Sequence, residues 1–196
     1  MAEEVHCRYC FDVLASHLQH THCPDPPFPT DASFPLFVTW NKRNENGQLD
    51  LRGCIGCLSP LPISSLKNYA LTSALNDRRF SPVNAHELPL LHCTVSLLTN
   101  FEVASSLDDW TIGPHGVLID YVDPNGQART AVYLPDVIPE QGWSKAETVD
   151  SLVRKSGYTG QISESLRAQI KLTRYQSTKC TVSYDKWKMG PKAGAR

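Results

Sequence analysis

The segment LRGCIG, residues 51–56, carries side chains that could take part in chemistry. It contains the thiol of Cys54 and the guanidinium of Arg52, with Gly53 and Gly56 interleaved. If the segment is a regular strand, side chains alternate, and Arg52 and Cys54 lie on the same face. A cation beside a thiol favours the thiolate, which is the nucleophilic form of cysteine. The pattern predicts a thiol and a cation presented together to a cleft.

The glycines of this segment allow two interpretations. Glycine in a strand lets a ligand or another backbone approach closely. If the neighbour is a ligand, Gly53 and Gly56 are ligand-binding positions. If it is a packed helix, Cys54 is a small core residue, because free cysteine behaves as a small hydrophobe. The spacing of the residues leaves both interpretations open.

A thiol-dependent enzyme also needs an acid or base, and His115 is the candidate. It lies in IGPHGV, between glycines and directly before a predicted strand. A loop histidine suits proton transfer because its unperturbed pKa lies near neutrality. The alternative is a turn histidine that bonds only to the backbone. Only the fold can bring Cys54 and His115 together.

A second charged group, Asp77 with Arg78 and Arg79, follows a predicted helix and precedes Phe80. Arginines at the end of a helix complement its dipole, which is a purely structural role. The guanidinium fork also matches carboxylate and phosphate groups. Asp77 and Arg79 are therefore predicted as ligand-binding residues, with helix termination as the alternative.

The sequence contains two C-x-x-C pairs, which are Cys7 with Cys10 and Cys54 with Cys57. The gap between the pairs is much longer than in compact zinc ribbons. Cys7 and Cys10 also fall on the apolar face of a predicted helix, where they would be core thiols. We therefore predict no metal site. Because the sequence has no G-x-G-x-x-G, Walker, H-E-x-x-H or G-x-S-x-G motif, we predict no cofactor.

The composition is that of a globular domain, with 196 residues of which 41% are hydrophobic and 20% charged. A net charge of -1 gives no basis for binding nucleic acid or an anionic membrane. There is no apolar run of the roughly 20 residues that a membrane span needs. The acidic start MAEEVHCRYC is not a secretory signal, so the seven cysteines are predicted to be reduced thiols in the cytoplasm, the nucleus or both.

Residue periodicity predicts the elements that position these side chains. Helices are expected at 4–20, 64–76, 144–158 and 163–170. Strands are expected at 35–42, 49–58, 92–101, 116–122, 127–134 and 178–184, with hairpin turns at NENG and DPNG. Five prolines make 21–35 a loop. Helices and hairpins mix without regular alternation, which predicts an α+β fold.

At LRGCIG the chain resembles the AMMECR domain family. The resemblance extends over residues 5–188 and includes the segments PLFVTW, LTSAL, VSLLTNFE, EQGW and IKLTRY. The sequences EQGW and IKLTRY are most similar to those of the animal members. It implies two unequal, intertwined subdomains, each an antiparallel sheet with flanking helices. The N- and C-terminal segments would share the larger subdomain, and LRGCIG would lie near a cleft. Apart from the resemblance, the basic and small residues of the C-terminal end predict a flexible tail at 189–196. Relatives usually carry another residue at Cys57, so the second C-x-x-C pair is not a family feature.

The family resemblance implies no established activity, and two hypotheses follow. In the first, Cys54 is the nucleophile of a thiol-dependent group transfer or modification, Arg52 stabilises its thiolate or an anionic substrate, and His115 is the acid or base. In the second, the same cleft docks a partner protein or peptide without catalysis. The partner is thus an unidentified protein or small molecule.

Overall fold

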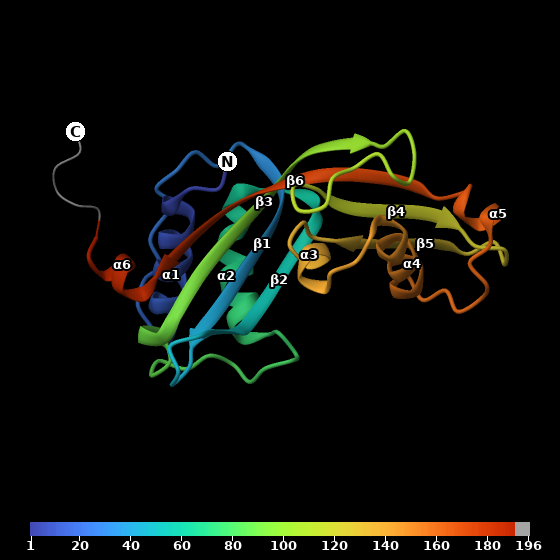
Figure 1. Ribbon diagram of the computed structural model, residues 1–196. Helices are drawn as coiled ribbons and strands as arrows, with labels where there is room; N and C mark the ends of the chain where they lie inside the picture. Colours follow the sequence, from blue (N-terminus) through green and yellow to red (C-terminus); the bar gives the residue numbers. More distant parts are fainter. Residues whose placement is uncertain (191–196) are drawn as a thin grey trace. The chain divides into compact units, whose positions relative to one another are not determined.

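The structure is a computed structural model that describes residues 1–190 (Figure 1). Most of the predicted tail at 189–196 therefore lies outside the described residues. The strands are β1 (Ser33–Arg43), β2 (Leu49–Pro62), β3 (Leu91–Val103), β4 (Gly116–Val122), β5 (Ala128–Tyr133) and β6 (Lys171–Ser183). The helices are α1 (Glu4–Leu18), α2 (Leu66–Leu75), α3 (Val137–Gln141), α4 (Lys145–Lys155), α5 (Glu164–Arg167) and α6 (Tyr184–Lys188).

The strands are ordered β2-β1-β3-β6-β4-β5, and the pairings of β1 with β2 and β3, and of β4 with β5 and β6, are antiparallel. Helices accompany the strands without βαβ alternation, which confirms the α+β class. The chain divides into two compact units: unit 1 comprises 1–97 with 178–196, and unit 2 comprises 98–177. The N- and C-terminal segments thus belong to the same unit, and β3 and β6 each contribute to both.

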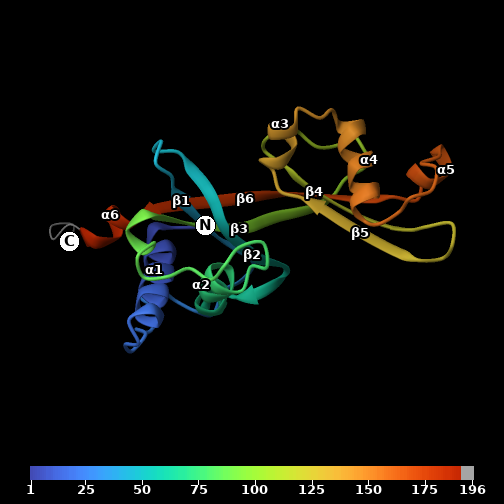
Figure 2. The same ribbon diagram turned by 90° about the horizontal axis from the view of Figure 1, so that it is seen from below.

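The core of unit 1 lies between its strands and the helices α1 and α2, which lie on one side of them (Figure 2). Alternate residues of β1, which are Leu36, Val38 and Trp40, are fully buried. The Trp40 indole Nε1 donates a hydrogen bond of 3.0 Å to the backbone oxygen of Ala70 in α2. This bond satisfies the polar atom of a buried aromatic ring, so Trp40 anchors α2 to the sheet.

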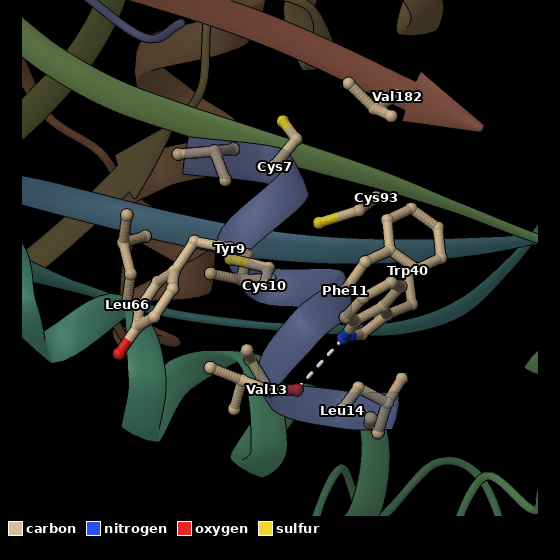
Figure 3. Close-up of a cluster of buried hydrophobic side chains, with 14 of the residues drawn as sticks. Cys7, Tyr9, Cys10, Phe11, Val13, Leu14, Trp40, Leu66, Cys93 and Val182 are labelled. Carbon is tan, nitrogen blue, oxygen red and sulfur yellow. Dashed lines mark hydrogen bonds between the residues drawn. The ribbon is translucent and has the colours of Figure 1, made fainter. Parts of the chain in front are cut away.

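Helix α1 places its apolar residues in this core as the sequence predicted. Cys7, Cys10, Phe11 and Leu14 have no exposed surface. Figure 3 shows them beside Trp40 and Cys93, which reach the same cluster from β1 and β3. The first C-x-x-C pair is therefore part of a packed core, as its place on the apolar face indicated.

The core of unit 2 forms where α4 packs on β4 and β5 (Figure 2). The predicted capping box at the start of α4 is present, because Ser144 accepts a hydrogen bond from the Glu147 backbone while the Glu147 carboxylate accepts one from Ser144. Gly157 follows the helix with φ of +87°, a left-handed conformation that glycine adopts without strain. Both signals for the ends of α4 are confirmed.

The sequence did not predict α3, α6, the first half of β6 or the 3-10 helix at Leu88–Leu90. Helices α3 and α6 have only five residues each and lack a full period of apolar positions. Within the described part of the chain, no helix is both long and apolar enough to cross a membrane.

Candidate functional site around Cys54

Cys54 lies on the edge strand β2, opposite Thr39 of β1. Its backbone N–H donates a hydrogen bond of 2.9 Å to Oδ2 of Asp77, and its carbonyl oxygen accepts one of 3.3 Å from Nη2 of Arg79. An edge strand normally leaves such groups unpaired. Here two side chains occupy the place of a neighbouring strand, so the backbone of Cys54 is held on its outer side. We call Asp77 and Arg79 the edge clamp.

The edge clamp is itself an ion pair. Arg79 donates to Asp77 through Nε at 3.0 Å and through Nη2 at 2.7 Å. The Asp77 side chain is 5% exposed whereas that of Arg79 is 55% exposed. The Arg79 guanidinium, with help from the Cys54 and Arg79 backbone N–H groups, holds the pKa of Asp77 well below its usual range. Asp77 therefore stays ionised, and its carboxylate can accept hydrogen bonds from both the Cys54 backbone and the Arg79 guanidinium.

The thiol of Cys54 is half-buried and accepts a hydrogen bond of 3.1 Å from the hydroxyl of Thr39. Two cations interact electrostatically with this thiol, one on Arg79 and one on Lys179 of β6. Burial lowers the pKa of Lys179, and the charge of Cys54 acts in the opposite direction. The sulfur of Cys54 thus has one hydroxyl donor and interacts with two cations.

The glycines of LRGCIG are explained by close packing within unit 1. A Cβ atom on Gly53 would lie 1.9 Å from the backbone oxygen of Ser73 in α2. A Cβ atom on Gly56 would lie 2.2 Å from the Phe37 ring. The helix interpretation is therefore confirmed for Gly53, and the ring of Phe37 occupies the space beside Gly56. A ligand contact at either glycine stays a prediction.

Arg52 departs from the regular strand on which its predicted position depended. The register shifts between Trp40 and Asn41, whose partners are Gly53 and Leu51, so Arg52 is the extra residue of a β-bulge. A bulge redirects the side chain and breaks the alternation that would have placed Arg52 with Cys54. The cations that interact with the thiol are Arg79 and Lys179 instead.

The guanidinium of Arg52 is bound by the carboxylate of Glu87, whose side chain is 12% exposed. Its Nε and Nη2 donate hydrogen bonds of 2.9 and 3.0 Å to the two oxygens of Glu87, and Nη1 donates one of 2.8 Å to the Ser81 backbone oxygen. Glu87 also accepts a bond of 2.9 Å from Lys42. These contacts, with Arg52 the strongest, lower the pKa of Glu87 to about 2. Arg52 fastens β2 to the 81–87 segment, and its predicted role beside the thiol stays untested.

His115 belongs to unit 2, whereas Cys54 and the edge clamp belong to unit 1. The ring Nδ1 of His115 accepts a hydrogen bond of 2.9 Å from the Thr111 backbone N–H. The backbone N–H of His115 donates a hydrogen bond of 3.1 Å to the Thr111 backbone oxygen. The ring thus closes a turn, as the alternative interpretation described. With Nδ1 as acceptor, a neutral ring carries its proton on Nε2. Its acid or base role stays a prediction.

The second C-x-x-C pair does not form a joint site. Residues three apart on a strand point to opposite faces, so Cys54 faces Thr39 while Cys57 contacts Tyr69 of α2. In residues 1–190, no group of three or more histidine, cysteine or acidic side chains is placed to hold a metal ion.

Sequence reasoning missed three residues of this site: Thr39, Lys179 and Glu87. Thr39 could have been found, because it lies in the strand that pairs with LRGCIG through the predicted hairpin. Lys179 and Glu87 could not, since the contact of each depends on a tertiary arrangement that no local pattern encodes. The fold brings Cys54, Asp77 and Arg79 together in the edge clamp, and the ligand-binding role of Asp77 and Arg79 stays a prediction.

Comparison with known proteins identifies the class of this α+β domain. The AMMECR1 family model matches residues 7–180, and the chain belongs to the AMMECR1 family. An uncharacterized protein of Arabidopsis thaliana is 51% identical over 181 residues, covering 91% of this chain and 84% of the relative. A protein of Thermococcus kodakarensis is 32% identical over 158 residues, covering 74% of each.

A solved structure supports the fold. The crystal structure of an uncharacterized protein from Pyrococcus horikoshii matches with a TM-score of 0.72 and 23% sequence identity, covering 91% of this chain and 90% of that one. The similarity shows that the fold is shared. The predicted family membership and fold class are thereby confirmed, and the activity is left to the geometry of the site.

Proposed function

We propose that the domain acts through the thiol of Cys54, as nucleophile or acceptor in a group-transfer or modification reaction. The observation that carries the proposal is the combination of a half-exposed thiol, a hydroxyl donor at 3.1 Å and two cations that interact with the sulfur. The edge clamp holds the Cys54 backbone on both its N–H and its carbonyl. A nucleophile held in this way loses little orientational freedom on reaction.

Acyl transfer illustrates a reaction that this site can support. The Cys54 thiolate attacks the carbonyl carbon of a thioester, a new S–C bond forms, and the C–S bond of the donor breaks. The departing thiolate takes up a proton from solvent, so no oxidant or reductant is needed. Thr39 and Lys179 stabilise the attacking thiolate, and Arg79 contributes its charge from the clamp.

Five of the other cysteines have a different environment. Cys7, Cys10 and Cys93 have no exposed surface. Burial raises the pKa of Cys180 to about 11, which keeps it a thiol at neutral pH. The half-exposed Cys23 donates a hydrogen bond to the Pro24 backbone oxygen. Cys23 therefore provides an internal reference for an ordinary accessible thiol.

The test is the alkylation rate of each cysteine by iodoacetamide at pH 7, read from peptide masses. We expect Cys54 to react about tenfold faster than Cys23, because a hydroxyl donor and two cations act on the sulfur of Cys54. Thr39→Val and Lys179→Met should slow Cys54 severalfold and leave Cys23 unchanged. Lys67→Met, which changes an exposed lysine of α2, is the matched control and should change neither rate.

The proposal fails if Cys54 reacts no faster than Cys23, or if the three variants have the same effect on Cys54. In a second experiment, the same proteins are exposed to a small acetyl thioester. Acetylation confined to Cys54, and absent in Cys54→Ser, would assign the acceptor directly.

A second candidate function is a binding module without catalysis. The favouring observation is that Arg52, Gly53, Gly56 and the edge clamp all have partners inside unit 1, so these motif residues are accounted for by folding. In that case Cys54→Ser should preserve the biological phenotype as well as the thermal melt. An enzyme would lose the phenotype while keeping the melt.

A further inference from the structure

Unit 2 contains a pocket that is separate from the Cys54 site. It has a volume of about 720 Å³, within the range of small-molecule sites. Its walls come from the 104–108 segment, the first residues of α4, α5 with the residues after it, and the start of β6. All of these belong to unit 2, so the pocket is complete within one compact unit.

The floor of the pocket is apolar. Val149 and Leu172 line it although they are only 1% and 2% exposed, and Ile170 lines it at 9% exposure. Small side chains of Ala104 and Ala146 leave the space above this floor open. An apolar body of a few carbon atoms would be removed from water here, which is favourable in proportion to the area covered.

The rim of the pocket is charged. Three cations line it, from Lys145, Arg167 and Lys171, together with the carboxylates of Asp108 and Glu164. Arg167 is already paired, because it donates a hydrogen bond of 2.8 Å to Asp150 outside the lining and lies 3.8 Å from Glu164. Its charge is therefore compensated within the protein.

The two lysines have no carboxylate partner within residues 1–190. Lys145 donates a hydrogen bond of 2.8 Å to the backbone oxygen of Asp108, and its ammonium lies 5.8 Å from the centre of the Trp110 ring. These contacts fix the position of the ammonium without neutralising it. Lys171 is exposed and also lines the pocket. Two ammonium groups without an ion pair in the described residues thus line the pocket, together with the carboxylates of Asp108 and Glu164.

The N-terminal end of α4 does not provide the binding site for the anion. The Ser144–Glu147 capping box satisfies its first turn and already places a carboxylate there. The attraction for an anion comes from the ammonium groups of Lys145 and Lys171.

We propose that this pocket binds a small organic acid. Its apolar part would cover Val149 and Leu172, and its carboxylate would accept hydrogen bonds from Lys145 and Lys171. This binding function is independent of any reaction at Cys54. The proposal also predicts the charge of the preferred ligand, because an amine with the same carbon chain would be repelled by the same two lysines.

The experiment compares hexanoate with hexylamine, two probes of equal chain length and opposite charge. Binding to the full chain is followed by the NMR shifts of the Val149 and Leu172 methyl groups. We expect hexanoate to shift these methyls in a saturable manner and hexylamine to leave them unshifted at the same concentration. Raising the salt concentration should weaken the binding, because Lys171 is exposed and Lys145 is partly exposed to solvent.

Two variants test the two parts of the site. Lys171→Gln removes a charge that has no ion-pair partner in the described residues, so the fold should be unaffected, and we expect the hexanoate dissociation constant to rise severalfold. Ala146→Leu fills the space above the floor and should abolish the methyl shifts. Lys67→Gln, in the other unit, is the matched control and should bind like the wild type.

The proposal is overturned if hexanoate leaves the methyls unshifted, or if hexylamine binds as well as hexanoate. It is also overturned if Lys171→Gln binds hexanoate as tightly as Lys67→Gln does. A normal thermal melt of each variant shows that loss of binding does not come from unfolding.

Discussion

The carboxylate of Asp77 lies 2.9 Å from the backbone nitrogen of Cys54, joining the end of α2 to the edge of the sheet. With Arg79 it gives the edge strand the hydrogen bonds that another strand would otherwise provide. Two motifs that lie 23 residues apart in the sequence are thus one structural unit. The position of the Cys54 thiol depends on this unit, whatever its chemistry.

Asp77→Asn should loosen this strand edge. The amide cannot pair with Arg79 as the carboxylate does, and Arg79 loses its charge partner. We expect the free energy of unfolding to fall by about 2 kcal/mol, less than for a fully buried pair because Arg79 is half-exposed. Urea unfolding measures the loss, and the amide of Cys54 should exchange with deuterium faster. Asp31→Asn, at an exposed loop position, should change neither quantity.

Glu87→Gln should destabilise the protein in a pH-dependent manner. The Arg52 and Glu87 side chains are 10% and 12% exposed, and breaking such a pair leaves a cation without its partner, at a cost of about 3 kcal/mol. The pKa of Glu87 is lowered from 4.5 to about 2, so its contribution is present above pH 4.5 and lost as the pH falls toward 2. The stability difference between wild type and variant should therefore be largest near pH 7.

The measurement is urea unfolding of both proteins between pH 2.5 and pH 7. The control is Glu4→Gln, because Glu4 forms more exposed pairs with Arg8 and Lys186 and should contribute well under about 1 kcal/mol. A difference that stays constant over this pH range would contradict the ion pair as its cause.

Gly53→Ala should be strongly destabilising. The added methyl would meet the Ser73 backbone oxygen at 1.9 Å, and a helix backbone cannot yield as a flexible side chain can. We expect a loss of about 3 kcal/mol or more, measured as a lower thermal midpoint. Gly47→Asn is the control, because nothing lies within 4 Å of a Cβ atom there and asparagine tolerates the positive φ. Equal effects of the two changes would refute the packing explanation of Gly53.

The sequence predicted most of the fold because its signals are local. The apolar spacing of 4–20, the hairpin turns and the capping box of Ser144 with Glu147 each act within a few residues. The β-bulge at Arg52 could not be predicted in this way, since it is visible only in the register between β1 and β2. That single extra residue is why the cation assigned to the thiol is bound to Glu87 instead.

The candidate site was partly predictable for the same reason. Cys54, Asp77 and Arg79 were selected by residue type, and the structure joins them through the edge clamp. Their roles could not be deduced, because a clamp on a strand edge and a ligand site use the same residue types. Lys179 comes from a strand far along the chain, and no periodicity relates it to LRGCIG.

Cys54→Ser and Cys93→Ser distinguish a cysteine retained for chemistry from one retained for packing. Cys93 has no exposed surface, burial raises the pKa of its thiol, and its neighbours are the thiols of Cys7 and Cys10. A hydroxyl there would lack a good partner, so we expect Cys93→Ser to lose about 2 kcal/mol in urea unfolding. At position 54 a serine hydroxyl can still bond to Thr39, and the loss should stay below about 1 kcal/mol.

If Cys54→Ser destabilises the protein as much as Cys93→Ser does, Cys54 is a core residue and the thiol proposal loses its structural basis. If only Cys93→Ser is destabilising, packing does not account for the cysteine in LRGCIG, and its reactivity becomes the property to measure.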